Sequence, residues 1–132
     1  MDWHVIYSGI NQEAIVVRGL AAKNFEVYYP VGKRVVSHAR QRTVKTFPVF
    51  SRYVFVKFDP IEFSTIKSED GVIDILRNNW EPVRVSAWII EELKIRENSG
   101  HFDILPATPA RKPKWSKGME ILKNLLKIET IA

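Results

Sequence analysis

The sequence predicts an α+β fold, a small α/β sandwich in which a mostly antiparallel sheet is flanked by about three helices. Two observations predict this class. Short apolar runs with strand character alternate with segments of helical periodicity, and the connections between them are short. The chain of 132 residues is 45% hydrophobic, which suits one globular domain with a core of its own. A proline-rich linker and a short tail follow this domain.

The first elements are a strand, a helix and a second strand. Trp3–Tyr7 is a short apolar and aromatic run before a Ser-Gly turn, which predicts a strand. Asn11 can cap a helix that continues to about Lys23, because apolar residues recur there at helical spacing. Phe25–Tyr29 predicts the second strand, which ends at the proline that follows.

The middle of the chain predicts a hairpin, the clearest strand and a short helix. Residues 31–45 form two arms around a polar tip at Ser37–Gln41, and Arg52–Phe58 is a strongly apolar run. Asp59-Pro60 then begins a short helix, with the aspartate as its cap and the proline as its first residue.

The last elements of the domain are a strand and a helix. Gly71 ends the short helical unit, and Val72–Leu76 predicts an apolar strand before a turn at Asn78-Asn79. Ser86 caps the last helix, which continues to about Asn98 and is closed by a Ser-Gly pair.

The composition changes after residue 100. Three prolines follow within eight residues: Pro106, Pro109 and Pro113. Such spacing prevents a helix or a central strand and favours an extended linker. We therefore divide the chain into a domain at 1–100, a linker at 101–114 and a tail at 115–132.

Basic residues are concentrated in one internal segment. The chain has a net charge of +5, and no acidic residue occurs between Val27 and Phe58. This segment carries the following cations: Lys33, Arg34, Arg40, Arg42, Lys45, Arg52 and Lys57. A basic segment on a balanced body suits contact with a polyanion such as nucleic acid. It is equally consistent with a solvated loop that keeps the protein in solution.

The residue types needed for catalysis or metal binding are absent or scattered. The chain has no cysteine, which excludes disulfides, thiolate zinc sites and a cysteine nucleophile. His4, His38 and His101 have no partner at a metal-ligand spacing, and no glycine-rich phosphate loop or nucleophile elbow occurs. We expect neither an enzyme nor a cofactor or metal. No secretion signal or membrane span is visible, so we expect a cytoplasmic protein.

The most informative segment is Phe47–Phe58, with the sequence FPVFSRYVFVKF. Alternate residues of a strand point to opposite faces, so Tyr53 and Phe55 share one face, with Phe50 just upstream. One face of the sheet goes under the helices, and the other has less to cover it. If this strand pairs with the first one, Tyr7 joins these rings in an exposed aromatic patch that would bind a protein. The alternative is that the rings fill a second small core.

The ordered set of motifs resembles the N-terminal (NGN) domain of the NusG family of transcription elongation factors, and most closely its specialised RfaH-like branch. The resemblance begins at Trp3, is strongest over Phe47–Pro60 and continues through Gly71-Val72 to Leu93. It covers about three quarters of the chain. It implies the same α/β sandwich as the residue patterns do.

The resemblance also implies a function, that of a bacterial transcription elongation and antitermination factor. Family members bind the β′ clamp helices of RNA polymerase and bridge to its β subunit across the DNA channel, which suppresses pausing and increases processivity. By position, the clamp-helix contact would fall on Tyr7, Phe50, Tyr53 and Phe55, with Ile90 and Leu93 at the rim. The contact with the β gate loop would fall on Ser64 and Thr65, which keep the hydroxyl groups of the family's motif.

The basic segment corresponds to the family's variable hairpin, which faces upstream or non-template DNA. The resemblance implies a backbone-binding role for five residues: Lys33, Arg34, Arg40, Arg42 and Lys45. Glu69 and Asp70 stand where RfaH-like proteins carry a basic residue, so phosphate would be repelled there. The alternative function is a stand-alone nucleic-acid-binding module that uses the hairpin at 33–45.

The tail resembles the beginning of the family's C-terminal KOW domain, a small barrel that recruits Rho or ribosomal protein S10. Trp115–Leu122 matches its first strand, but the 18 residues from 115 to 132 cannot close a barrel, so a truncated or divergent KOW domain would lose these contacts. As a helix, the tail would carry Met119, Leu122 and Leu126 on one face and could dock on the aromatic patch. We expect a monomer.

Overall fold

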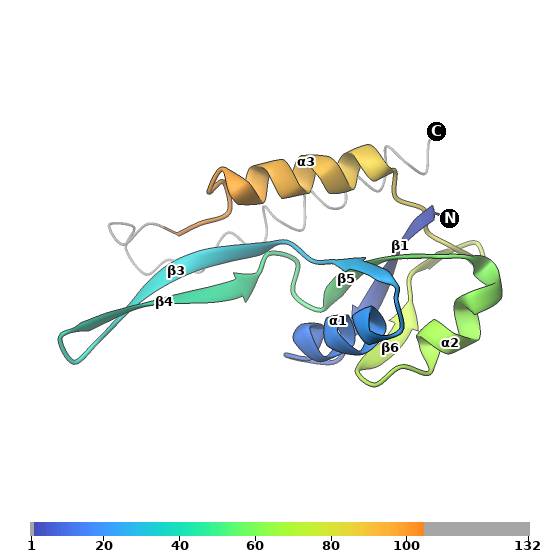
Figure 1. Cartoon of the computed structure of the whole chain (residues 1–132), viewed down its shortest axis with the longest axis horizontal. Helices are drawn as coiled ribbons and strands as arrows, with labels where there is room; N and C mark the ends of the chain where they lie inside the picture. The colour runs from blue at the N-terminus through green and yellow to red at the C-terminus, as the bar shows by residue number, and fades with distance from the viewer. Residues whose placement is uncertain (1, 105–132) are drawn as a thin grey trace.

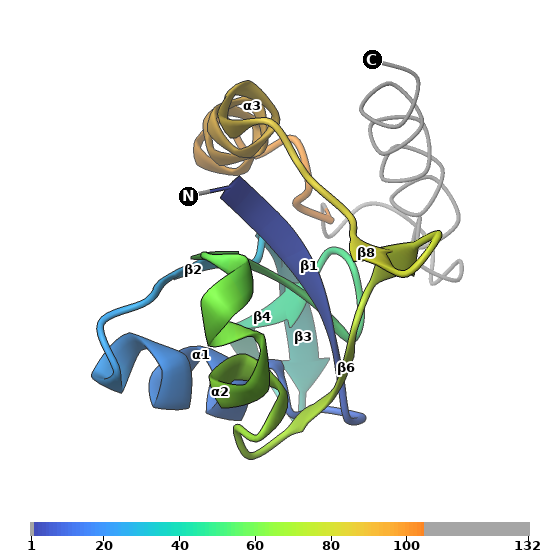
Figure 2. The ribbon, with the colours of Figure 1, turned by 90° about the vertical axis from the view of Figure 1, so that its right-hand side faces the viewer.

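The computed structural model describes residues 2–104, which form an α+β unit with mostly antiparallel strands (Figure 1). A four-stranded sheet lies between two layers of helices (Figure 2). Helices α1 (Glu13–Ala22) and α2 (Phe63–Lys67) cover one face, and α3 (Ala87–Asn98) covers the other. The predicted fold class is therefore confirmed.

The central sheet has the strand order β2-β5-β1-β6, and every neighbouring pair is antiparallel. The inner strands are β1 (Asp2–Ser8) and β5 (Tyr53–Phe58), and the edge strands are β2 (Glu26–Tyr28) and β6 (Val72–Ile75). Both inner strands are largely buried, because helices cover each face of the sheet; β5 is mostly apolar on both faces, whereas β1 places the buried polar residues His4 and Ser8 on the face toward α1 and α2.

Two hydrophobic clusters fill the space on either side of the sheet. The cluster under α1 and α2 contains Ile6, Val16, Leu20, Val54, Val56, Phe58, Ile66 and Ile75. The cluster under α3 contains Trp3, Val5, Val49, Phe50, Phe55, Val85, Ile89, Ile90 and Leu93. The alternation of β5 thus divides its side chains between two cores, as the strand period requires.

A long hairpin of β3 (Val31–His38) and β4 (Gln41–Pro48) extends away from the sheet (Figure 1). Its two-residue turn has positive φ angles at Ala39 and Arg40, as tight hairpin turns need. The 3-10 helix η1 (Pro60–Glu62) precedes α2.

Residues 101–104 pack against the base of this hairpin. The amide of Ile104 donates to the carbonyl of Lys33 over 2.8 Å, and the Asp103 carboxylate accepts from the Lys33 amide over 2.9 Å. Gly32 permits this approach, because a Cβ there would clash with the carbonyl oxygen of Phe102. The folded unit therefore reaches at least to Ile104.

Most predicted elements are confirmed, with small changes at their ends. The predicted cap of the first helix is wrong. Asn11 adopts a left-handed φ of 59°, which places it outside the helix, and Gln12 stands at the cap position instead. The turn predicted at Asn78-Asn79 lies one residue later, at Asn79 and Trp80, between β7 (Arg77–Asn78) and β8 (Glu81–Pro82).

Within residues 2–104, no helix is long and apolar enough to span a membrane. The predicted tail helix with Met119, Leu122 and Leu126 lies outside the described residues, as does most of the predicted linker.

Candidate protein-binding surface and basic hairpin

The register of β1 and β5 brings two partly accessible tyrosines, Tyr7 and Tyr53, together. Val5 lies opposite Phe55, and Tyr7 lies opposite Tyr53, so all four side chains share the face that α3 covers. The centroids of the two tyrosine rings are 5.5 Å apart. The pairing that the aromatic-patch argument assumed is therefore present.

The prediction that the whole aromatic patch is exposed is wrong. Phe50 and Phe55 are 1% and 0% exposed, and their rings meet edge to face at 6.3 Å. Ile90 and Leu93, predicted at the rim, are equally buried because they are part of the α3 surface that packs on these rings. The sequence argument failed because it assigned the helices to one face of the sheet, whereas α3 crosses to the other. The alternative interpretation, that these side chains fill a second small core, is therefore correct for four residues: Phe50, Phe55, Ile90 and Leu93.

Tyr7 and Tyr53 lie at the end of this face and are only half-buried. The guanidinium of Arg52 lies 4.3 Å from the centroid of the Tyr7 ring, a cation–π geometry. Its Nε donates to the carbonyl of Ser8 over 3.0 Å, which fixes the arginine in this position. We call Tyr7, Arg52 and Tyr53 the tyrosine surface.

A pocket of about 440 Å³ adjoins the tyrosine surface. Its lining combines apolar and charged side chains: Tyr7, Asp74, Ile75, Leu76, Arg77 and Trp80. Such a mixture of aromatic residues and arginine is typical of the energetic centre of protein interfaces. The pocket shows that the accessible part of this face continues from the tyrosines toward the β7–β8 hairpin.

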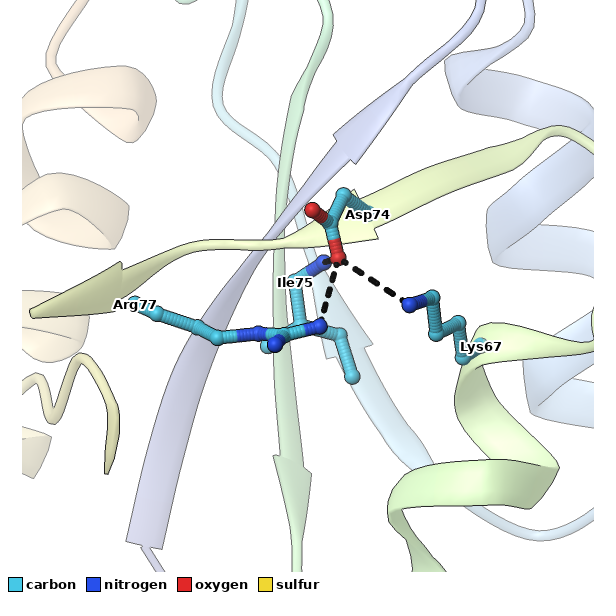
Figure 3. A network of polar contacts seen from close by, with 4 residues as sticks. All are labelled: Lys67, Asp74, Ile75 and Arg77. Carbon is cyan, nitrogen blue, oxygen red and sulfur yellow. Dashed lines mark hydrogen bonds and ion pairs between the residues drawn. The ribbon is translucent and has the colours of Figure 1, made fainter. Parts of the chain in front are cut away.

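A polar network is centred on Asp74 (Figure 3), and three of its members, Asp74, Ile75 and Arg77, line the pocket. Its Oδ1 accepts from the Ile75 amide over 2.8 Å and from the Arg77 guanidinium over 3.1 Å, and Lys67 Nζ lies 3.8 Å away. The Ile75 amide, together with the two cations, lowers the pKa of the Asp74 carboxyl below its ordinary value. Asp74 is thus a carboxylate at neutral pH, with its charge offset by its neighbours.

The far end of α3 is tied to the base of the β3–β4 hairpin. The Glu97 carboxylate accepts from the Val31 amide over 2.7 Å and from the Tyr28 hydroxyl over 3.3 Å. Burial, followed by the charge of Glu97, raises the pKa of Tyr28 well above its ordinary value, so the hydroxyl keeps its proton and remains a donor. These contacts fix the direction of the hairpin relative to the sheet.

The five predicted nucleic-acid residues all lie on the exposed part of the β3–β4 hairpin: Lys33, Arg34, Arg40, Arg42 and Lys45. They do not share one face. Arg34 lies directly opposite Lys45, whereas Lys33 and Arg42 point to the other side, and Arg40 is in the turn. Among the described residues, none of the five forms an ion pair with an acidic side chain. The β3–β4 hairpin therefore presents positive charge on both of its faces, and we call it the cationic arm.

The other predicted contact residues lie on or near α2. Ser64 and Thr65 are exposed in its first turn. Glu69, which follows α2, pairs with Lys23 Nζ at 2.5 Å, and its side chain packs over Gly19 of α1. The Glu69 carboxylate is therefore largely buried and its charge is offset by Lys23, so the expected repulsion of phosphate at this position stays a prediction.

The contacts of His4 and His101 are those of residues with a structural role. His4 is 2% exposed, its Nδ1 donates to the carbonyl of Val83 over 2.8 Å, and its ring lies against Phe58. His101 lies beside Phe102 at the surface. No group of acidic residues and histidines within residues 2–104 is arranged to hold a metal ion.

Two residues were not predicted as functional: Arg52 of the tyrosine surface and Trp80 of the adjoining pocket. Arg52 lies inside the most informative segment, but its φ of 74° and its position over Tyr7 depend on the tertiary structure. Trp80 had a visible signal, since it is a large aromatic residue directly after an Asn-Asn turn.

Together these features define a small α+β protein with an accessible tyrosine surface on one side and a cationic arm on the other, both suited to contact with macromolecules. The sequence model of a family described as transcription termination factor nusG matches residues 1–94. The chain therefore belongs to the NusG family. It is a transcription termination or elongation factor in the broad sense, from a family that interacts with RNA polymerase and is not enzymatic.

Proposed function

We propose that the protein is a bacterial transcription elongation and antitermination factor of the RfaH-like type, which binds the β′ clamp helices of RNA polymerase through its tyrosine surface. The observation that carries this proposal is the partly accessible pair Tyr7 and Tyr53 beside the pocket, on the sheet face that α3 otherwise covers. Phe50, Phe55, Ile90 and Leu93 then act indirectly, because they support the two tyrosines from below.

Two further contacts fit the same placement. The exposed hydroxyls of Ser64 and Thr65 would meet the gate loop of the β subunit, so that the protein bridges the DNA channel. The cationic arm would contact the backbone of upstream or non-template DNA. Bridging the two sides of the channel would hold the polymerase clamp closed and thereby suppress pausing.

The domain organisation belongs to this proposal. We propose that residues 1–100 form the polymerase-binding domain, with its last contacts extending to Ile104, and that 101–114 links it to a KOW-like segment at 115–132.

A pause-site assay with purified bacterial polymerase tests the proposed function. Adding the protein should shorten the dwell at the pause and increase the yield of full-length RNA, because a bridged clamp resists the paused state. The measurement is the pause half-life at several protein concentrations. A matched reaction with the variant Tyr7→Ala, Tyr53→Ala should keep the half-life of polymerase alone. An unchanged half-life with the native protein would contradict the proposal.

The alternative, a stand-alone nucleic-acid binder, is favoured by the unpaired cations of the hairpin, and its contribution can be measured separately. Duplex DNA binding should weaken with salt, and replacing Arg40 and Arg42 with alanine should reduce the slope of log K against log salt by about 2, since each phosphate contact contributes about 0.9. The matched control is Arg18→Ala, an exposed cation on α1. If both proteins show the native slope, the hairpin does not contact DNA.

A further inference from the structure

The β7–β8 hairpin has an unusual turn. Its two turn residues, Asn79 and Trp80, have positive φ angles of 52° and 73°. Turns of this kind favour Asn followed by Gly, because a Cβ is crowded in the left-handed region. A bulky tryptophan in the glycine position is a costly choice for stability, and such strain persists where it serves a function.

The indole of Trp80 gains nothing from burial in the free protein. It is 90% exposed, the same fraction as Ile61 on η1 and far more than Trp88 on α3, at 54%. A large exposed aromatic side chain in a strained turn has no evident role in the stability of the monomer. This combination points to a partner that covers the ring.

The hairpin places Trp80 at the pocket beside the tyrosine surface. The Val83 amide donates to the carbonyl of Leu76 over 2.9 Å, which closes the base of the hairpin. Asp74 fixes Arg77, the first residue of β7, through the network in Figure 3. Trp80 and Tyr7 line the same pocket, so the indole extends the tyrosine surface without any rearrangement.

We propose that Trp80 is a third anchor of the polymerase-binding surface, and that its partner is a helical protein element with an apolar side chain for the pocket and acidic side chains around it. This inference rests on the proposed function. The charges define the partner: three cations, Arg52, Lys67 and Arg77, lie around the pocket and outnumber Asp74, the acidic side chain of its lining. The surface therefore has positive charge left for an acidic partner.

Replacing Trp80 with glycine tests the proposal with a readout that a structural role would not give. Glycine relieves the strain of the turn, so the melting temperature should stay the same or rise. Affinity for a purified β′ clamp-helix fragment should fall roughly tenfold or more, as for the loss of an interface anchor. The measurements are thermal unfolding and calorimetric titration.

Asn79→Gly is the matched control, because it relaxes the same turn and keeps the indole; its affinity should be unchanged. Trp88→Ala removes an exposed indole on α3 and should also bind normally. Affinity of the Trp80→Gly protein within about twofold of native would overturn the proposal. So would loss of single-stranded DNA binding with fragment binding intact, since the indole would then stack on bases.

The same titration separates this inference from the proposed function. If Tyr7→Ala with Tyr53→Ala abolishes fragment binding and Trp80→Gly does not, the third anchor is refuted and the proposed function stands. If the native protein does not bind the fragment at all, both are refuted.

Discussion

Truncation of Phe55 to alanine should lower the free energy of unfolding by about 3–5 kcal/mol. The ring is fully buried between β5 and α3, where it meets Phe50 edge to face and stacks beside Tyr28 at 6.5 Å. Its removal leaves a cavity that the surrounding cluster cannot fill completely. Urea unfolding measures the effect, and the matched control is Ile95→Ala on α3, where the side chain is 61% exposed.

A loss below about 1 kcal/mol for Phe55→Ala would contradict the packing described here, because an exposed ring would cost little. The result also decides how binding experiments are designed. A variant at Phe50 or Phe55 loses stability and binding together, so only variants at accessible residues can identify the interface.

Replacing Tyr7 and Tyr53 together with alanine should weaken binding to the β′ clamp-helix fragment at least 100-fold, since each anchor of this kind contributes about 2 kcal/mol or more. The two rings lie side by side at the open end of the sheet face, and each loses its hydroxyl and its apolar area in the variant. Calorimetric titration of the purified protein measures the change.

The control for this double variant is Ile61→Ala on η1, which removes an exposed apolar side chain outside the tyrosine surface. The melting temperature of the double variant must stay above the assay temperature, because both rings are partly buried. Retention of native affinity by a folded double variant would refute the assignment of the tyrosine surface to the clamp helices.

The sequence was sufficient to predict the fold class, the order of the elements and the two faces of β5. These features depend on local pattern: alternation in Phe47–Phe58, helical spacing after Asn11 and turn residues between strands. The pairing of β1 with β5 was only assumed from the sequence, because local pattern does not determine which strands are neighbours; the structure shows it, with Tyr7 opposite Tyr53.

The accessibility of the patch could not be predicted in the same way. A strand pattern shows that Phe55 and Tyr53 share a face, but the path of α3 decides which of them is covered. That path depends on long-range contacts, such as Glu97 with the Val31 amide and Val85 with Trp3, which no local pattern contains. For the same reason the sequence showed the charges of the hairpin but not their division between its two faces.

The most direct test of the account is chemical-shift mapping of the labelled full chain during titration with the β′ clamp-helix fragment. We predict that the largest changes occur at Tyr7, Arg52, Tyr53 and the indole of Trp80, whereas Arg40 and Arg42 at the tip of the hairpin stay unchanged. Changes confined to the hairpin at 33–45, with the tyrosine surface unaffected, would contradict the central claim.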